Sequence, residues 1–186
     1  AHMIYDANTD KYVYMGEAVY SAHDGYLFRR VGTKNSAAEI TWDSNEAYTT
    51  GNIGNQMAAT YDNKTKKIWA VYDKGNNTGV YSCGYDTENN TVLSGNTLQS
   101  IADVQDPLKI IAAGDHLVVA MEYVGSGHSY SSGWVCIGQG NSAGNNIDWN
   151  STLYPWTPSG SGTQSYFGGD IIWHSTNSRL VVFGKI

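Results

Sequence analysis

The segment between residues 150 and 169 carries aromatic side chains among serine, threonine and glycine residues. It exceeds about 12–15 residues, the length above which irregular segments of compact domains are usually functional or disordered. An aromatic ring can stack on a pyranose while short polar groups bond its hydroxyls, so this composition predicts sugar binding. The competing interpretation is that Trp156 folds back and closes one end of the fold. The predicted ligand-binding side chains of this segment are Tyr154, Trp156, Tyr166 and Phe167.

Three short polar segments form a second candidate site, at 21–25, 73–79 and 126–133. Each ends at a glycine that begins a strand-like stretch, so the three segments occupy equivalent places and are expected on one face. Loops gathered on a rigid framework are common places of ligand binding. The alternative is that they are ordinary solvated turns. The side chains predicted to bind ligand here are His23, Asp24, Asn76, Asn77, His128 and Tyr130.

The sequence motifs give little support for a metal site or for catalysis. Residues 6–10 spell D-x-N-x-D, the start of a calcium loop, but Lys11 follows and no glutamate occupies the bidentate position, so an ordinary turn is predicted. The sequence has no HExxH, GxSxG, P-loop or dinucleotide motif, and we expect no cofactor, metal or catalytic residue. Cys83 and Cys136 are expected as two buried thiols on equivalent strands, with a disulfide between them as the alternative.

A repeat of about 54 residues supplies the framework for these candidate sites. Gly25, Gly79 and Gly133 are each 54 residues apart, and each begins a strand-like stretch. A hairpin precedes each glycine. A turn and a fourth strand follow, at 40–44, 91–95 and 147–151. The sequence therefore predicts a four-stranded unit three times and then a final hairpin.

The second strand of each unit is apolar at successive positions, as in Ile68-Trp69-Ala70-Val71. A strand with one buried face alternates between apolar and polar residues, so this pattern predicts cover on both faces. The expected fold is all-β, a propeller-like array of four-stranded antiparallel blades with about 3.5 repeats per chain. Residues 1–3 look like a tag remnant. The predicted single domain spans 4–186, with repeats at about 4–54, 55–108, 109–167 and 168–186.

Two of the predicted hairpins share a pattern, YDANTDKYVYMGEAVY at 5–20 and YDNKTKKIWAVYD at 61–73. This pattern resembles the blades of sialidase-like and phage tail-fibre β-propellers. The resemblance implies a propeller, and in the sialidase-like family an arginine triad that holds the substrate carboxylate. The arginines of this chain are Arg29, Arg30 and Arg179, and the neighbours Arg29 and Arg30 are expected on opposite faces of one strand. These three arginines therefore argue against catalysis of the sialidase type.

Charge and hydropathy exclude further classes of function. The net charge is −6, and lysine and arginine are few and scattered, which argues against binding to nucleic acid or to an anionic membrane surface. No apolar run approaches 18 residues, so no membrane-spanning segment is predicted.

These features together predict a non-catalytic module that binds a glycan or receptor on a cell surface. The resemblance suggests the distal part of a phage tail fibre or an adhesin, at an extracellular or virion surface. A fragment of a sialidase-like glycoside hydrolase and a protein-binding propeller scaffold are the alternatives. Because the final half unit would leave a sheet uncovered, we also expect self-association or further blades outside this sequence.

Overall fold

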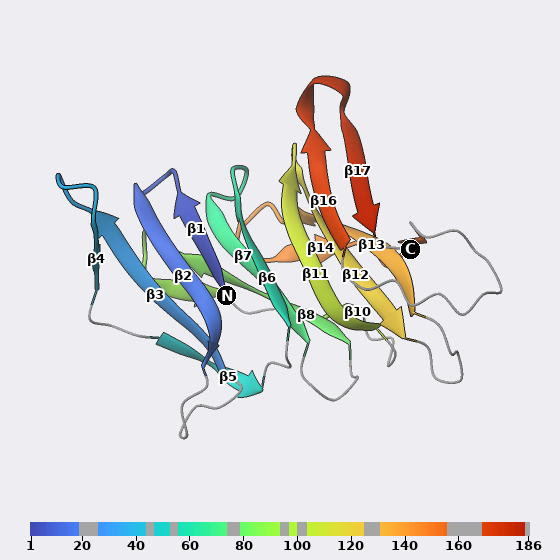
Figure 1. Cartoon of the computed structure of the whole chain (residues 1–186), viewed down its shortest axis with the longest axis horizontal. Coiled ribbons are helices and arrows are strands. Elements are labelled where there is room, and N and C mark those ends of the chain that lie inside the picture. The colour runs from blue at the N-terminus through green and yellow to red at the C-terminus, as the bar shows by residue number, and fades with distance from the viewer. Residues whose placement is uncertain are drawn as a thin grey trace.

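The computed structural model contains antiparallel sheets that stack in chain order (Figure 1). It describes residues 1–18, 26–43, 47–52, 56–73, 79–93, 97–99, 104–124, 131–155 and 169–184. The first sheet pairs β1 with β2, β2 with β3, and β3 with both β4 and β5. Its strands are β1 (His2–Asp6), β2 (Lys11–Ala18), β3 (Tyr26–Lys34), β4 (Ile40–Trp42) and β5 (Ala47–Asn52).

The second and third sheets repeat this pairing. The second contains β6 (Met57–Asp62), β7 (Lys67–Asp73), β8 (Val80–Asp86), β9 (Thr91–Leu93) and β10 (Thr97–Gln99). The third contains β11 (Val104–Ala113), β12 (His116–Val124), β13 (Ser131–Gly140), β14 (Ile147–Trp149) and β15 (Tyr154–Pro155). The last sheet is the hairpin of β16 (Gly169–His174) and β17 (Arg179–Gly184), joined through the 3-10 turn η1 (Ser175–Asn177).

The all-β class and the repeated order of antiparallel strands are confirmed. The structure adds a short strand at the end of each unit, because β5, β10 and β15 each pair with the beginning of the unit's third strand. The third sheet begins at Val104, whereas the sequence predicted that the third repeat begins at about residue 109. In the first sheet, His2 and Met3 belong to β1, and the His2 ring contacts the Met57 carbonyl oxygen at 2.9 Å.

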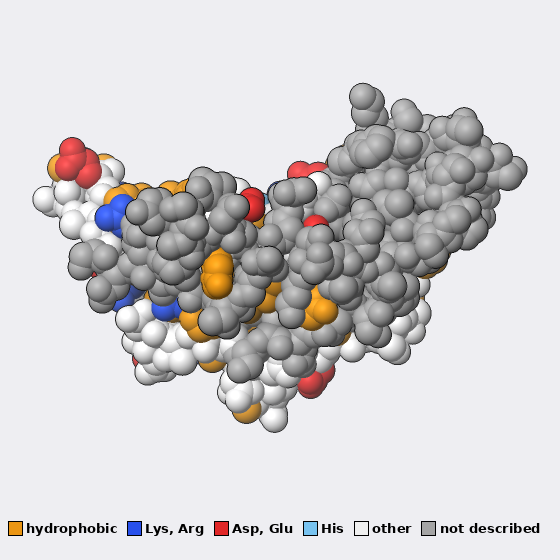
Figure 2. Space-filling view, turned by 90° about the horizontal axis from the view of Figure 1, so that it is seen from below, with side chains coloured by type: hydrophobic (Ala, Val, Ile, Leu, Met, Phe, Trp, Pro, Cys, Tyr) orange, Lys and Arg blue, Asp and Glu red, His pale blue; other side chains and the backbone are white. Residues whose placement is uncertain are grey.

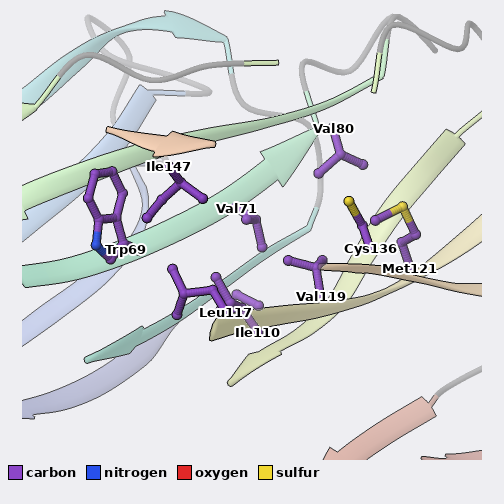
Figure 3. Close-up of a cluster of buried hydrophobic side chains, with 10 residues drawn as sticks. Trp69, Val71, Val80, Ile110, Leu117, Val119, Met121, Cys136 and Ile147 are labelled. Carbon is purple, nitrogen blue, oxygen red and sulfur yellow. The ribbon is translucent and has the colours of Figure 1, made fainter. Parts of the chain in front are cut away.

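Successive sheets pack face to face through apolar side chains. We call the side of a sheet that points to the next sheet in chain order its forward face, and the opposite side its rear face. One cluster joins the forward face of the first sheet to the rear face of the second, and others join the second to the third and the third to the hairpin. Figure 3 shows the cluster between the second and third sheets, where Trp69 and Val71 meet Leu117 and Val119.

Cover on both faces is confirmed for the two central second strands. In β7, Ile68 and Ala70 pack toward the first sheet, while Trp69 and Val71 pack toward the third. All four side chains are buried, and every residue from Leu117 to Met121 in β12 is buried as well. Because β2 lies in the first sheet and β17 in the last, each of these strands is covered on one face.

The first strands of successive sheets also contact one another, since β1 lies against β6, β6 against β11, and β11 against β16. The first strands therefore lie next to one another along one side of the stack, and the later strands of each sheet extend away from that side (Figure 1). Among the described residues, the structure contains no helix with the length and apolar character needed to cross a membrane.

Candidate functional site

The strand directions gather the connections into two sets at opposite ends of the stack. Ala18 pairs with Tyr26, Asp73 with Val80, and Val124 with Ser131, so the connections between second and third strands leave from one end. The short strands β5 and β15 lie at this end as well, because Asn52 pairs with Tyr26 and Pro155 with Trp134. Both candidate sites predicted from sequence are therefore anchored at the same end, which we call the loop end; it is the lower end in Figure 1.

Figure 2 looks at the molecule from the loop end. Described hydrophobic side chains show at the surface near the middle of this face, and the visible lysine and arginine side chains lie over the first sheet. This view agrees with the low positive charge of the chain, which carries 11 lysine and arginine residues against 17 acidic ones.

The beginning of the 150–169 segment is held against the third sheet. Asn150 accepts a hydrogen bond from the Thr152 backbone amide at 2.9 Å, and Leu153 packs against the cluster between the second and third sheets. Tyr154 and Pro155 then pair with β13. Tyr154 is 45% exposed. Trp156, Tyr166 and Phe167 lie outside the described residues.

The second predicted group lies outside the described residues as well: His23, Asp24, Asn76, Asn77, His128 and Tyr130. The structure does describe the glycines that end two of these segments. Gly79 has a φ of 112°, a conformation that favours glycine, and so it turns the chain into β8. Gly133 is buried inside β13, which begins two residues earlier, at Ser131.

The three arginines do not converge on one site. The Arg29 guanidinium lies 3.9 Å from the ring centroid of Tyr85 in the second sheet, and its Nη2 donates to Asn90 Oδ1 at 3.4 Å. Arg30 lies on the opposite face of β3, where its Nε donates to the Asp43 carbonyl oxygen at 3.2 Å. Arg179 is exposed at the beginning of β17, in the last sheet of the stack. The described arginines therefore do not form the carboxylate-binding triad of the sialidase-like family.

The aspartate at the end of β1 closes a turn, as the sequence predicted. Asp6 accepts hydrogen bonds from the Asn8 amide and the Thr9 hydroxyl, both at 2.8 Å, and Asp10 takes a φ of 54°. Asp62 makes the same contacts with Lys64 and Thr65, and Lys66 also has a φ of 54°. Such side chain to backbone bonds define a tight turn and occupy the carboxylate oxygens. In the described part of the chain, no three His, Cys, Asp or Glu side chains form a metal-binding group.

Both cysteines are free and buried, which confirms the prediction of two buried thiols. They hold equivalent positions, because Cys83 pairs with Ala70 in the second sheet and Cys136 with Val119 in the third. Burial raises the pKa of Cys83 to about 12 and that of Cys136 to about 11. Thiols held in the protonated form are poor nucleophiles, so these cysteines serve in packing.

Sequence reasoning missed the polar contacts that join one sheet to the next. Asp6 in the first sheet accepts a hydrogen bond from the Thr87 hydroxyl in the second. Trp149 in the third sheet donates its Nε1 proton to Ser82 in the second at 3.1 Å. Both aspartate turns could be recognised in the sequence, where the D-x-x-T spacing recurs at 6–9 and 62–65. The contacts between sheets could not, because Thr87 lies in a different sheet from Asp6, and Ser82 in a different sheet from Trp149.

No protein-family model matches this chain, and no curated protein matches its sequence.

Proposed function

We propose that the chain is a non-catalytic recognition module, built as an arc of a β-propeller, that binds a glycan on a cell surface. The observation that carries this proposal is the shared loop end. All connections between second and third strands start there, as does the aromatic segment that follows Tyr154. Loops that a rigid framework places side by side are the usual position of binding residues.

The sheet arrangement supports the propeller part of the proposal. In a propeller, four-stranded sheets pack face to face around an axis, and each blade lies between two others. Here the first strands of neighbouring sheets contact one another, and β7 and β12 are covered on both faces. A recognition role at a cell or virion surface is in keeping with this fold and with the net charge of −6.

The described side chains favour binding over hydrolysis. Arg29 is occupied by Tyr85 and Asn90, and Arg179 begins the last strand of the stack. A glycosidase of the sialidase-like type needs its arginines together on one substrate carboxylate. A glycan-binding site needs exposed aromatic rings and short polar groups, and Tyr154 is such a ring.

A glycan array probed with the purified chain tests the proposal. We expect binding to one class of surface polysaccharide, and about five- to thirtyfold weaker binding in Tyr154→Ala and Trp156→Ala, since an aromatic ring that stacks on a ligand contributes on the order of 1–2 kcal/mol. Tyr5→Ala is the matched control, because Tyr5 is 46% exposed but precedes the turn at the opposite end of the stack. Absence of binding to every glycan, or equal loss in all three variants, would overturn the proposal.

A further inference from the structure

The outermost faces of the stack, on the first sheet and on the final hairpin, expose large hydrophobic side chains. Among the described residues, six large hydrophobic side chains are exposed, and four of them lie on the outermost faces. Met3 and Tyr5, 53% and 46% exposed, lie on the rear face of the first sheet. Ile172 and Phe183, 47% and 53% exposed, lie on the forward face of the hairpin, opposite the side that packs on the third sheet.

The forward face of the hairpin corresponds residue by residue to a face that is buried elsewhere in the molecule. His174 pairs with Arg179 across a four-residue turn, as Asp6 pairs with Lys11, and Ser178 has a φ of 49° where Asp10 has 54°. This register aligns the two hairpins without a gap. The aligned forward-face pairs are Ile172 with Ile4, Val181 with Val13, and Phe183 with Met15.

The second sheet covers this face in the first sheet. Ile4, Val13 and Met15 are 7%, 0% and 2% exposed there. Their counterparts in the hairpin are of the same apolar type but remain accessible. The forward face of the hairpin therefore has the apolar composition of a face that packs against another sheet.

The rear face of the first sheet has a buried counterpart as well. Gly32 pairs with Trp42 in the first sheet as Gly138 pairs with Trp149 in the third. In both sheets the glycine leaves room for the tryptophan ring and an isoleucine, Ile40 or Ile147. In the third sheet this face lies against the second sheet, to which Trp149 donates a hydrogen bond.

The rear face of the first sheet also has the composition of an interface. Tyr5 packs on Tyr12, with ring centroids 5.1 Å apart, and Tyr14 lies edge-on to Phe28 at 5.9 Å. The Arg30 guanidinium lies 5.9 Å from the Trp42 ring. Tyrosine, tryptophan and arginine are the residues most enriched at the centres of protein interfaces.

We propose that two copies of this chain bind head to tail, the forward face of the hairpin in one copy packing on the rear face of the first sheet in the other. Each junction inside the molecule joins a forward face to a rear face. The contact between copies repeats this rule and is heterologous, so it generates a closed ring or an open chain of molecules rather than a symmetric pair of like faces.

Two variants block one face each. Tyr5→Lys places a charge on the rear face of the first sheet, and Phe183→Lys places one on the forward face of the hairpin. Val92→Lys is the matched control, because Val92 is 40% exposed on β9 in the second sheet, away from both outermost faces. Each variant changes the net charge of −6 by the same single unit.

Light scattering across a concentration series is the measurement. We expect the wild type and Val92→Lys to exceed the monomer mass of 20.3 kDa as concentration rises, while Tyr5→Lys and Phe183→Lys each remain monomeric. An equimolar mixture of these two variants then gives a dimer and nothing larger, because the mixture has one intact pair of faces. Circular dichroism verifies that each variant is folded.

Three results would overturn the proposal. The first is a wild type that stays monomeric at every concentration, and the second is a mixture that stays monomeric although the wild type associates. The third is association of Phe183→Lys alone, which would mean that like faces of the first sheet bind each other. Glycan binding at the loop end is a separate measurement and does not change with these outcomes.

Discussion

Arg29 contributes to the contact between two sheets rather than to a substrate site. It points from the forward face of β3 into the second sheet, where its guanidinium covers the Tyr85 ring. The Tyr85 hydroxyl donates to Asn90 Oδ1 at 3.0 Å, the same oxygen that Arg29 reaches. Arg29 is 8% exposed, and burial lowers the pKa of its guanidinium. A cation held this way against an aromatic face stabilises the junction through packing as well as charge.

Replacing Arg29 by alanine therefore lowers the free energy of unfolding by about 1–3 kcal/mol, through the lost cation–π contact and the lost packing of the side-chain stem. Arg30→Ala is the matched control on the opposite face of the same strand, and we expect less than about 0.5 kcal/mol for it. Urea denaturation of both variants measures the difference. Equal losses would mean that the contact with Tyr85 does not stabilise the fold.

From the contacts of Asp86 we predict that the stability of the folded protein depends measurably on pH. Its Oδ2 lies 2.5 Å from Lys67 Nζ and accepts a hydrogen bond from Asn89 Nδ2 at 2.8 Å. Burial raises the pKa of Asp86, but the hydrogen bonds from Lys67 and Asn89 outweigh burial and hold the pKa below its ordinary value of 3.8. The carboxylate therefore contributes its full stability above about pH 4, and this contribution is lost as the pH falls through the lower native pKa.

Asp86→Asn should cost about 1.5–3 kcal/mol of unfolding free energy at pH 7, the range of a hydrogen-bonded charged pair. The difference from the wild type should shrink as the pH falls below about 4, because protonation removes the same charge. Asp148→Asn, on the exposed side of β14, is the control and should leave the profile unchanged. A difference that is constant from pH 7 to pH 2 would contradict the assignment.

The elements show which parts of the fold the sequence encodes locally. The cover of β7 and β12 was predictable because their apolar residues occupy both parities, as in Leu117 to Met121. The same expectation was wrong for β2 and β17, which have one covered face each because they lie in the first and the last sheet. The segments β5, β10 and β15 were not predicted. They contain two to six residues and are defined by pairing with distant third strands, which leaves little local pattern.

At Gly138, the paired strand β14 leaves no room for a side chain. A Cβ atom there would lie 2.4 Å from Trp149 Cε3 and 2.6 Å from Ile147 Cγ2, so Gly138→Ala forces the indole to move. We expect a loss of about 1–3 kcal/mol of unfolding free energy, the usual cost of overpacking a core. Gly16→Ala is the control, because its nearest neighbour would be Ala1 Cβ at 3.2 Å, at the chain terminus.

A double mutant tests the cause of that loss. The second sheet places Tyr85 and Val92 where the third places Gly138 and Trp149, so a larger third-strand residue goes with a smaller fourth-strand residue. Adding Trp149→Val to Gly138→Ala should therefore cost less than the sum of the single changes, although it removes the hydrogen bond to Ser82. Additive losses in thermal or urea unfolding would show that the two positions are independent.

For the whole molecule, the common end from which the candidate loops start was predictable. The repeat places the connections between second and third strands at one end, and the strand pairings anchor them there. The stacking order and the polar contacts between sheets were not predictable, because residues such as Asp6 and Thr87 are 81 positions apart and share no local pattern. Of the predicted site residues, the structure describes Tyr154, which is exposed, and its role in binding stays a prediction.

The stack also predicts a gradient of stability, which amide hydrogen exchange can measure. In dilute solution, β7 and β12 should exchange slowest, because their side chains are covered on both faces. The hairpin β16–β17 should exchange at least about tenfold faster, since it has two strands and one covered face. At high concentration, head-to-tail binding covers its forward face and should slow exchange in β17. Phe183→Lys should abolish that slowing while leaving β7 and β12 unchanged, whereas equal exchange in the hairpin and the central strands would contradict the gradient.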